Sequence, residues 1–272
     1  SDEGLVRWLN KVAEDTAAMI AHWERVGFVH GVMNTDNMSI HGITIDYGPF
    51  GWIEDYDLNW TPNTTDSNTK RYTFGNQRLV GEWNLARLLE AIGPLFEDPS
   101  NLYRTLEHYR ASFKNHNEDM WRRKLGLGSP SLGDNQLVEE LSSLLELVET
   151  DMTIFFRLLS ALDGPSAHEM AYAYYDDASL PVDELEEWLC KWWSRVDGNP
   201  DREAMNDANP KYVLRNWMSQ LAIDAAEEGD YSVAYELHGL MKGPYREQPE
   251  SEGRWFSKRP EWARNRVGCS ML

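Results

Sequence analysis

Cysteine is scarce in this sequence, and so are long apolar runs and positive charge. Its 272 residues include two cysteines, Cys190 and Cys269, too few for a disulfide framework or a zinc finger. Such scarcity favours a reducing compartment. No apolar run approaches the ~18 residues that span a bilayer. With 26 basic and 45 acidic residues the formal net charge is −19, which argues against nonspecific binding to nucleic acid. The sequence therefore predicts no nucleic-acid partner and no membrane partner.

Hydrophobic residues, by contrast, are plentiful. They make up 42% of the sequence and include 12 Trp, which is enough for a substantial core. The length allows one large domain or two small ones. The first residue is Ser1 rather than Met, and an amphipathic helical pattern begins within a few residues. We therefore expect the chain to be part of a longer protein.

Helical periodicity dominates the chain. Apolar residues from Leu5 to Trp23 recur at spacings of three and four, which predicts a helix that ends at Gly27. A short extended piece is expected at residues 28–30 and a loop at residues 55–76. Further helices are predicted at residues 81–92, 99–115, 118–125, 135–162 (with room for an interruption), 181–196, 201–204, 210–228 and 230–241. The break at residues 126–135 is the best internal boundary.

Some polar and aromatic residues are interpreted structurally. Asn209 is predicted to cap the helix at residues 210–228, with Pro210 at its first position. Lys211 and Arg215 are interpreted as surface charges. The Trp residues at positions 188, 192 and 193 have helical spacing and are interpreted as packing surface.

Two polar clusters near the start of the chain carry the candidate chemistry. The first is HGVMNTDN at residues 30–37, and the second is DYGPFG at residues 46–51. Between them, apolar runs at residues 38–40 and 43–45 flank a His-Gly pair, which predicts a β-hairpin. Because a hairpin doubles the chain back, Asp36 and Asn37 are expected near Asp46. A protein kinase has the same layout of catalytic loop, hairpin and metal-binding Asp.

Three residues of these clusters are candidates for catalysis. Asp36 is the candidate general base, because a carboxylate within reach can remove the proton of an attacking hydroxyl. Asn37 and Asp46 are candidate metal ligands, since Mg²⁺ prefers oxygen donors and completes its octahedron with phosphates and waters. All three also have a plainer interpretation, as residues that shape loops and turns. His30 is interpreted as a structural residue that bonds nearby backbone.

These strings resemble the selenoprotein O family. Besides residues 31–51, the similar strings are RYTFGNQ (71–77), GEWNL (81–85), NPKYVLRN (209–216) and PEWA (260–263), in the family's order. The family also places its Asn directly after the Asp, whereas protein kinases place it five residues later. The resemblance implies ATP as substrate, Mg²⁺ or Mn²⁺ as cofactor, and transfer of AMP to Ser, Thr or Tyr hydroxyls of proteins. It gives Asp36 the role of base and Asn37 and Asp46 the role of metal ligands.

The resemblance also implies parts that this sequence does not contain. The family's Gly-rich region, nucleotide-binding Lys and its Glu partner are missing. Residues 1–272 are therefore expected to form the C-terminal helical lobe of a protein-kinase-like fold, mainly α with a small β-hairpin region, whose partner is an absent N-terminal nucleotide-binding lobe. Alone, this lobe is expected to be inactive and to expose an apolar patch on the first helix and residues 28–52.

Family members carry a Cys or selenocysteine near the C-terminus, which suggests a redox role for Cys269. The resemblance further implies a mitochondrial location in a eukaryote or a cytoplasmic one in a bacterium. Two other functions remain open from the residues themselves. One is kinase-type phosphoryl transfer at the same site, because no spacing here distinguishes attack at the α-phosphate from attack at the γ-phosphate. The other is a non-catalytic helical interaction module.

Overall fold

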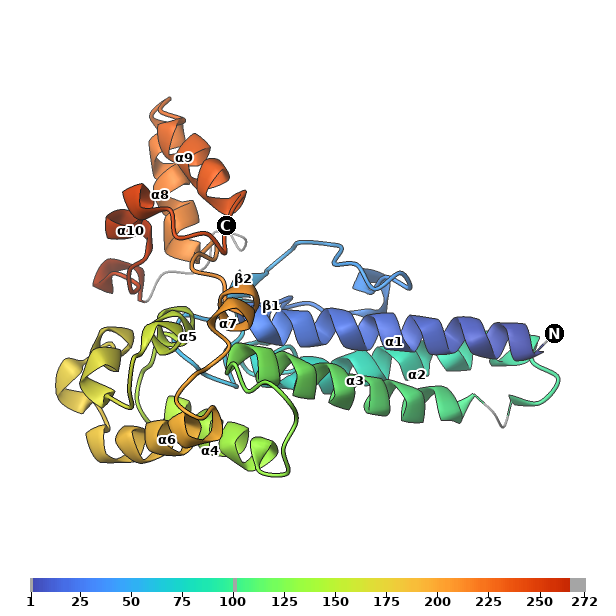
Figure 1. Ribbon diagram of the computed structural model, residues 1–272. Helices are drawn as coiled ribbons and strands as arrows, with labels where there is room; N and C mark the ends of the chain where they lie inside the picture. The colour runs from blue at the N-terminus through green and yellow to red at the C-terminus, as the bar shows by residue number, and fades with distance from the viewer. Residues whose placement is uncertain (1, 100–101, 265–272) are drawn as a thin grey trace.

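The structure, a computed structural model, describes residues 2–99 and 102–264 and is mainly helical (Figure 1). Its longer helices are α1 (Asp2–Val26), α2 (Gln77–Ile92), α3 (Tyr103–Lys124), α4 (Asp134–Leu147), α5 (Met152–Ala161), α6 (Val182–Arg195), α7 (Arg202–Ala208), α8 (Asn216–Glu227), α9 (Ser232–Met241) and α10 (Pro249–Trp255). Strands β1 (Phe28–Val29) and β2 (Gly51–Trp52) pair antiparallel. The predicted mainly helical class with a small β element is confirmed. Every helix in the described part is too short or too polar to cross a lipid bilayer.

The first three helices lie side by side in an elongated bundle, with the N-terminus at its far end (Figure 1). The predicted apolar stripe is the buried face of α1, where Val12 and Ile20 share a core with Tyr109 of α3. At Gly81 of α2, a Cβ would lie 2.4 Å from Ile20 Cδ1 and 2.8 Å from the Tyr109 hydroxyl. The three helices therefore meet where there is no room for a methyl group.

A second core joins α4, α5, α6 and α7 to the small sheet. Trp188 and Trp192 stack in it with ring centroids 6.3 Å apart, and their indole N–H groups donate to main-chain carbonyls at 2.9 and 2.8 Å. Their predicted packing role is confirmed. The same core contains Val29 of β1 and Ile53 directly after β2. The sheet is thereby fixed to the helical layer beneath it.

Helices α8, α9 and α10 form a third unit, which projects from the rest of the molecule (Figure 1). It has a core of its own, in which the rings of Trp217 and Trp255 stack with centroids 5.8 Å apart. Residues 209–215 lead into this unit as an extended connection. The unit thus has an apolar core of its own, and Phe256 packs against both this core and the one that contains α4 to α7.

Several predicted helix boundaries are wrong, and tertiary contacts explain why. The helices expected at residues 99–115 and 118–125 are one continuous α3. The interruption allowed within residues 135–162 is present, because α4 ends at Leu147 and Asp151 caps α5 through the Ile154 N–H at 3.0 Å. Asn209 caps no helix, because its amide oxygen accepts from Lys124 Nζ at 2.7 Å. The surface interpretation of Lys211 and Arg215 is also wrong, since both are buried.

The predicted hairpin at residues 38–45 forms its turn but not its strands. Gly42 N donates to Ser39 O at 3.3 Å, yet neither apolar run belongs to a strand of the described chain. Ile40 and Ile43 are instead exposed, in the region where an apolar patch is expected. Pairing occurs further out, in β1 and β2, because the rings of Phe28 and Trp52 pack there with centroids 5.3 Å apart. The chain still doubles back, so both polar clusters lie at one end of the sheet.

Candidate active site

The two polar clusters meet at Gly31 and Pro49. Gly31 has a φ of +79°, and a Cβ on it would lie 2.2 Å from the Pro49 carbonyl oxygen. Beside this contact, Val32 Cγ1 lies 3.6 Å from the position of a Cβ on Gly48. The main chain of residues 30–37 is therefore in direct contact with that of residues 46–51. Glycine is required at position 31, both for its backbone angle and for this close approach.

Asp36 lies exposed in a short 3₁₀ turn, η1 (Thr35–Asn37). Main-chain groups close this turn, since Asn37 N donates to Asn34 O at 3.0 Å. No hydrogen bond or ion pair reaches the Asp36 carboxylate from elsewhere in the described chain, so the alternative role as a loop cap is not observed. The carboxylate is free to accept a proton from a hydroxyl group.

Asn37 and Asp46 contribute one oxygen-bearing side chain from each cluster. Asn37 Nδ2 donates to Val32 O at 2.9 Å, which fixes the amide and leaves Oδ1 unbonded by the rest of the described chain. Asp46 has a left-handed φ of +55°, its own carbonyl accepts from Gly48 N at 2.8 Å, and its side chain is exposed. An amide oxygen and a carboxylate are hard donors of the kind that Mg²⁺ and Mn²⁺ prefer.

Protein side chains alone do not complete a metal site here. Within residues 2–99 and 102–264, no group of three or more His, Cys, Asp or Glu side chains could hold an ion. An ion held by Asn37 and Asp46 would therefore need oxygens from nucleotide phosphates and water, which is how Mg²⁺ commonly binds in nucleotide-dependent enzymes. The donor set fits such an ion, and the individual roles of the two residues stay predictions.

His30 supports the second cluster. Its side chain is buried, and Nε2 donates to the Ile45 carbonyl at 2.8 Å. Burial lowers the pKa of His30, against the opposing effects of the Ile45 carbonyl and the Asp46 charge. A neutral ring with its proton on Nε2 fits this environment. The interpretation of His30 as a structural residue bonded to nearby backbone is confirmed.

Buried amide side chains hold the first cluster from behind. They are Gln77, Asn84 and Asn63, and they bond main-chain groups of residues 28–33 at 2.9 to 3.1 Å. These positioning roles were not predicted from the sequence, although Gln77 and Asn84 lie in strings that carry the family resemblance. The available signal was a polar side chain on the apolar face of a predicted helix, as at Asn84. A buried amide needs partners, and here the loop backbone supplies them.

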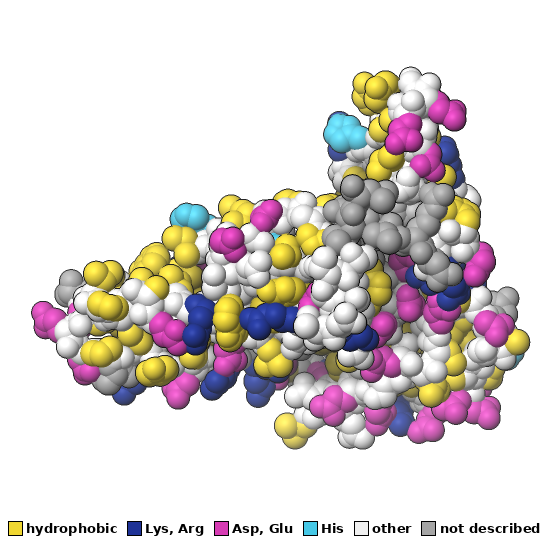
Figure 2. Space-filling model, turned by 180° about the vertical axis from the view of Figure 1, so that it is seen from behind, with side chains coloured by type: hydrophobic (Ala, Val, Ile, Leu, Met, Phe, Trp, Pro, Cys, Tyr) yellow, Lys and Arg dark blue, Asp and Glu magenta, His cyan; other side chains and the backbone are white. Residues whose placement is uncertain are grey.

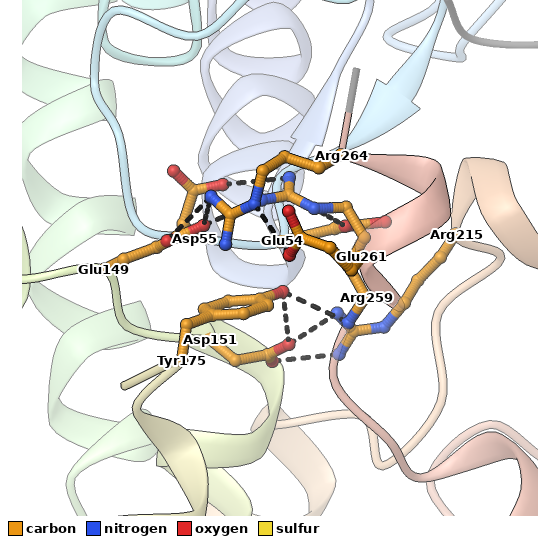
Figure 3. Close-up of polar contacts among 9 residues, drawn as sticks. All are labelled: Glu54, Asp55, Glu149, Asp151, Tyr175, Arg215, Arg259, Glu261 and Arg264. Atoms are coloured by element: carbon orange, nitrogen blue, oxygen red, sulfur yellow. Dashed lines mark hydrogen bonds and ion pairs between the residues drawn. The ribbon is translucent and has the colours of Figure 1, made fainter. Parts of the chain in front are cut away.

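A buried ion pair lies below β2 (Figure 3). Arg215, at the start of α8, binds the Asp151 carboxylate through two N–H groups at 2.6 and 2.9 Å. Both side chains are buried, and Tyr175 adds a hydroxyl hydrogen bond to Asp151 at 3.4 Å. Asp151 is the N-cap of α5, so this pair links the start of α5 to the extended connection that precedes α8. A two-pronged guanidinium–carboxylate contact fixes orientation as well as distance.

Next to this pair, Arg259 contacts two carboxylates that directly follow β2 and a third, Glu149, that lies between α4 and α5 (Figure 3). Its guanidinium lies 3.4 Å from Glu54, 3.4 Å from Asp55 and 2.7 Å from Glu149. Burial raises the pKa of Glu54 to about 7, although Arg215 and Arg259 oppose the shift. The C-terminal part of the described chain thereby holds the strand that leads out of the second polar cluster.

Cys190 is an exposed free thiol, whereas Cys269 lies outside the described residues.

Comparison with known proteins gives this site a context. The family profile described as "Protein adenylyltransferase SelO" matches residues 1–242. A protein from Flavobacterium johnsoniae named "Protein nucleotidyltransferase YdiU" is 50% identical, with 99% of this chain and 54% of the relative aligned. Proteins of the same name from Aromatoleum aromaticum and Xanthomonas axonopodis pv. citri are 49% and 47% identical, each over 97% of this chain. The chain spans about half the length of the curated relatives it matches.

Proposed function

Because this chain belongs to the SelO family of protein adenylyltransferases, we propose that it is the helical, catalytic-loop half of an enzyme that transfers AMP from ATP to protein hydroxyls. In this proposal residues 1–272 form the C-terminal lobe of a kinase-like fold. The nucleotide-covering lobe belongs to the half of the relatives that this chain does not span. Acceptors are proteins that present Ser, Thr or Tyr.

One observation carries the proposal. The contact between Gly31 and Pro49 places the loop with Asp36 and Asn37 against the loop with Asp46, and all three side chains keep acidic or amide oxygens free of bonds within the described chain. Oxygens without partners in the described chain are available to bind a metal ion whose remaining ligands are nucleotide phosphates and water.

The chemistry assigned to the residues follows from their positions. Asp36 takes the proton of the acceptor hydroxyl as its oxygen attacks the α-phosphorus of ATP. The new bond joins that oxygen to the α-phosphorus, and the bond to the bridging oxygen of pyrophosphate breaks. Asn37 and Asp46 would hold Mg²⁺ or Mn²⁺, which when bound neutralises phosphate charge. His30, Gln77 and Asn84 keep the two loops in register.

The test uses the full-length protein with Mg²⁺ and ATP labelled at either the α- or the γ-phosphate. Protein should be labelled from α-labelled ATP and not from γ-labelled ATP. Asp36→Ala should slow transfer by about 10²–10⁴-fold and leave affinity for Mg·ATP nearly intact, since a general base acts on the transition state. Asp46→Ala should instead abolish metal-dependent nucleotide binding in calorimetry.

Asp207→Ala is the matched control, because Asp207 is an exposed carboxylate on α7, outside both polar clusters. Its kinetics should equal those of the unmodified protein. Labelling from the γ-phosphate would establish phosphoryl transfer instead. Absence of any labelling, with unchanged Mg·ATP affinity in Asp46→Ala, would leave the interaction-module alternative.

A further inference from the structure

An exposed stack of arginine and aromatic side chains lies beside the catalytic loop. The Arg71 guanidinium carbon is 4.4 Å from the centroid of the Trp83 ring and 5.6 Å from that of Tyr72. On α2, one turn beyond Trp83, the Arg87 guanidinium carbon lies 5.4 Å from the same indole ring. We call these four residues the Arg–Trp platform. Stacking of a guanidinium on a ring leaves its N–H edge free to bind an anion.

The platform is tied directly to the loop that carries Asp36. The Tyr72 hydroxyl donates to Asn34 Oδ1 at 2.6 Å, two residues before Asp36 in the sequence. From below, the buried Asp66 carboxylate accepts the main-chain N–H groups of Arg71 and Tyr72 at 3.0 and 2.7 Å. The segment that presents Arg71 is therefore held in place before any ligand binds. Such preorganisation reduces the entropy lost on binding.

The positive charge of the platform is largely uncompensated. The Asp66 oxygens accept hydrogen bonds from main-chain N–H groups and a neighbouring hydroxyl. Arg71 has no ion pair within the described chain. Arg87 pairs with Glu90 one turn along α2, an exposed contact that is easily exchanged. Meanwhile Trp83 remains 41% exposed. Figure 2 shows Lys and Arg side chains among hydrophobic ones on the elongated, bundle-containing part of the molecule.

We propose that the Arg–Trp platform binds an acidic segment of the acceptor protein, close to the hydroxyl that receives AMP. The inference rests on the proposed function and adds a substrate preference to it. The chain carries a formal charge of −19, which would repel acidic proteins in general. An acidic acceptor is therefore attracted most strongly to a local cationic surface beside Asp36. Arg71 supplies the bidentate donor, and the Trp83 face supplies apolar contact.

The test compares two synthetic peptides in the full-length enzyme. Each peptide has one Ser, flanked by Glu in one and by Gln in the other, and AMP transfer is followed with α-labelled ATP. Arg71→Ala should lower the Glu-to-Gln ratio of kcat/KM about fivefold, through KM, as expected for an exposed charge pair. Arg71→Glu should lower it further and favour a third peptide flanked by Lys. Arg104→Ala, which removes an exposed Arg from α3, should leave the ratio unchanged.

Other outcomes overturn the inference. Equal losses for both peptides, or a change confined to the KM for ATP, would place the platform in nucleotide binding or folding. Equal kcat/KM of the unmodified enzyme for the Glu and Gln peptides would show that no acidic preference exists. If the unmodified enzyme labels nothing at all, the proposed function fails. Fluorescence anisotropy with dye-labelled Glu and Gln peptides then tests binding to the platform independently of AMP transfer. Equal affinities for the two peptides would refute the acidic preference.

Discussion

The buried pair of Asp151 and Arg215 offers the sharpest test of how the third helical unit is held. Asp151 is 0% exposed and Arg215 is 2% exposed, so neither charge is hydrated in the folded protein. Arg215→Ala removes both short hydrogen bonds from the carboxylate. What remains for Asp151 is the Ile154 N–H at 3.0 Å and the Tyr175 hydroxyl at 3.4 Å. A buried anion would thus lose its counter-charge.

Breaking one half of a buried pair typically costs about 3–5 kcal/mol, because the remaining charge stays desolvated. We expect Arg215→Ala to lower the free energy of unfolding by that amount. The double change Asp151→Asn with Arg215→Ala should cost less than Arg215→Ala alone, since it removes the same side-chain volume at position 215, leaves no unpaired charge and keeps a side-chain oxygen for the helix cap. Sub-additivity of this kind identifies the pair, rather than the volume of Arg215, as the source.

Urea denaturation of the full-length protein, followed by Trp fluorescence, measures the change. The control is Arg254→Ala, whose ion pair with Glu236 is half exposed and should contribute little. An unchanged slope with a lower midpoint would mean lost stability rather than altered cooperativity. If Arg215→Ala shifts the midpoint no more than Arg254→Ala does, the Asp151 carboxylate is solvated and its burial does not determine the stability.

Two further predictions concern the site and its support. Asn84→Ala should slow AMP transfer about tenfold in α-label assays, because the carbonyl of residue 33 loses its buried donor and the loop shifts; the exposed Asn68→Ala is the control, and equal rates for the two would contradict this role. Glu54 has a folded pKa of about 7 against an ordinary 4.5, so its contribution to stability is present at low pH and is lost as the pH rises through 7. Glu54→Gln should therefore become more stable relative to the unmodified protein between about pH 5 and pH 8 in thermal denaturation, and a constant difference across that range would refute the assignment.

Local patterns predicted the parts of the fold that depend on local forces. The stripe from Leu5 to Trp23 is α1, because a long amphipathic period fixes both the helix and its buried face. Short apolar runs were less informative. Residues 38–40 and 43–45 read as strands but remain partly exposed, whereas pairing went to the aromatic residues outside them. A two-residue strand leaves almost no periodicity to detect.

Contacts between distant residues account for the other errors. Asn209 has the sequence context of a helix cap, yet its partner is Lys124, 85 positions away. Arg215 and Lys211 read as surface charges because nothing near them in the sequence reveals Asp151 or Glu247. The contact between the two candidate loops was easier to predict, since residues 30–37 and 46–51 lie within one short segment that folds back on itself, and the roles of Asp36, Asn37 and Asp46 stay predictions. The amides behind it were missed because their partners are main-chain groups, which carry no sequence signal.

The contact of Gly31 with Pro49 means that the distance between the two loops of the candidate active site depends on the absence of a Cβ atom at position 31. The distance between the two loops depends on backbone lying on backbone, and any side chain at position 31 would act as a wedge between them. Mutational scans of the acidic residues would identify the side chains that activity requires. They would not identify the backbone contact that sets the distance between the two loops. Transfer of Asp36, Asn37 and Asp46 to another scaffold therefore requires the backbone contact between the two loops as well. The three side chains do not by themselves set the distance between the loops.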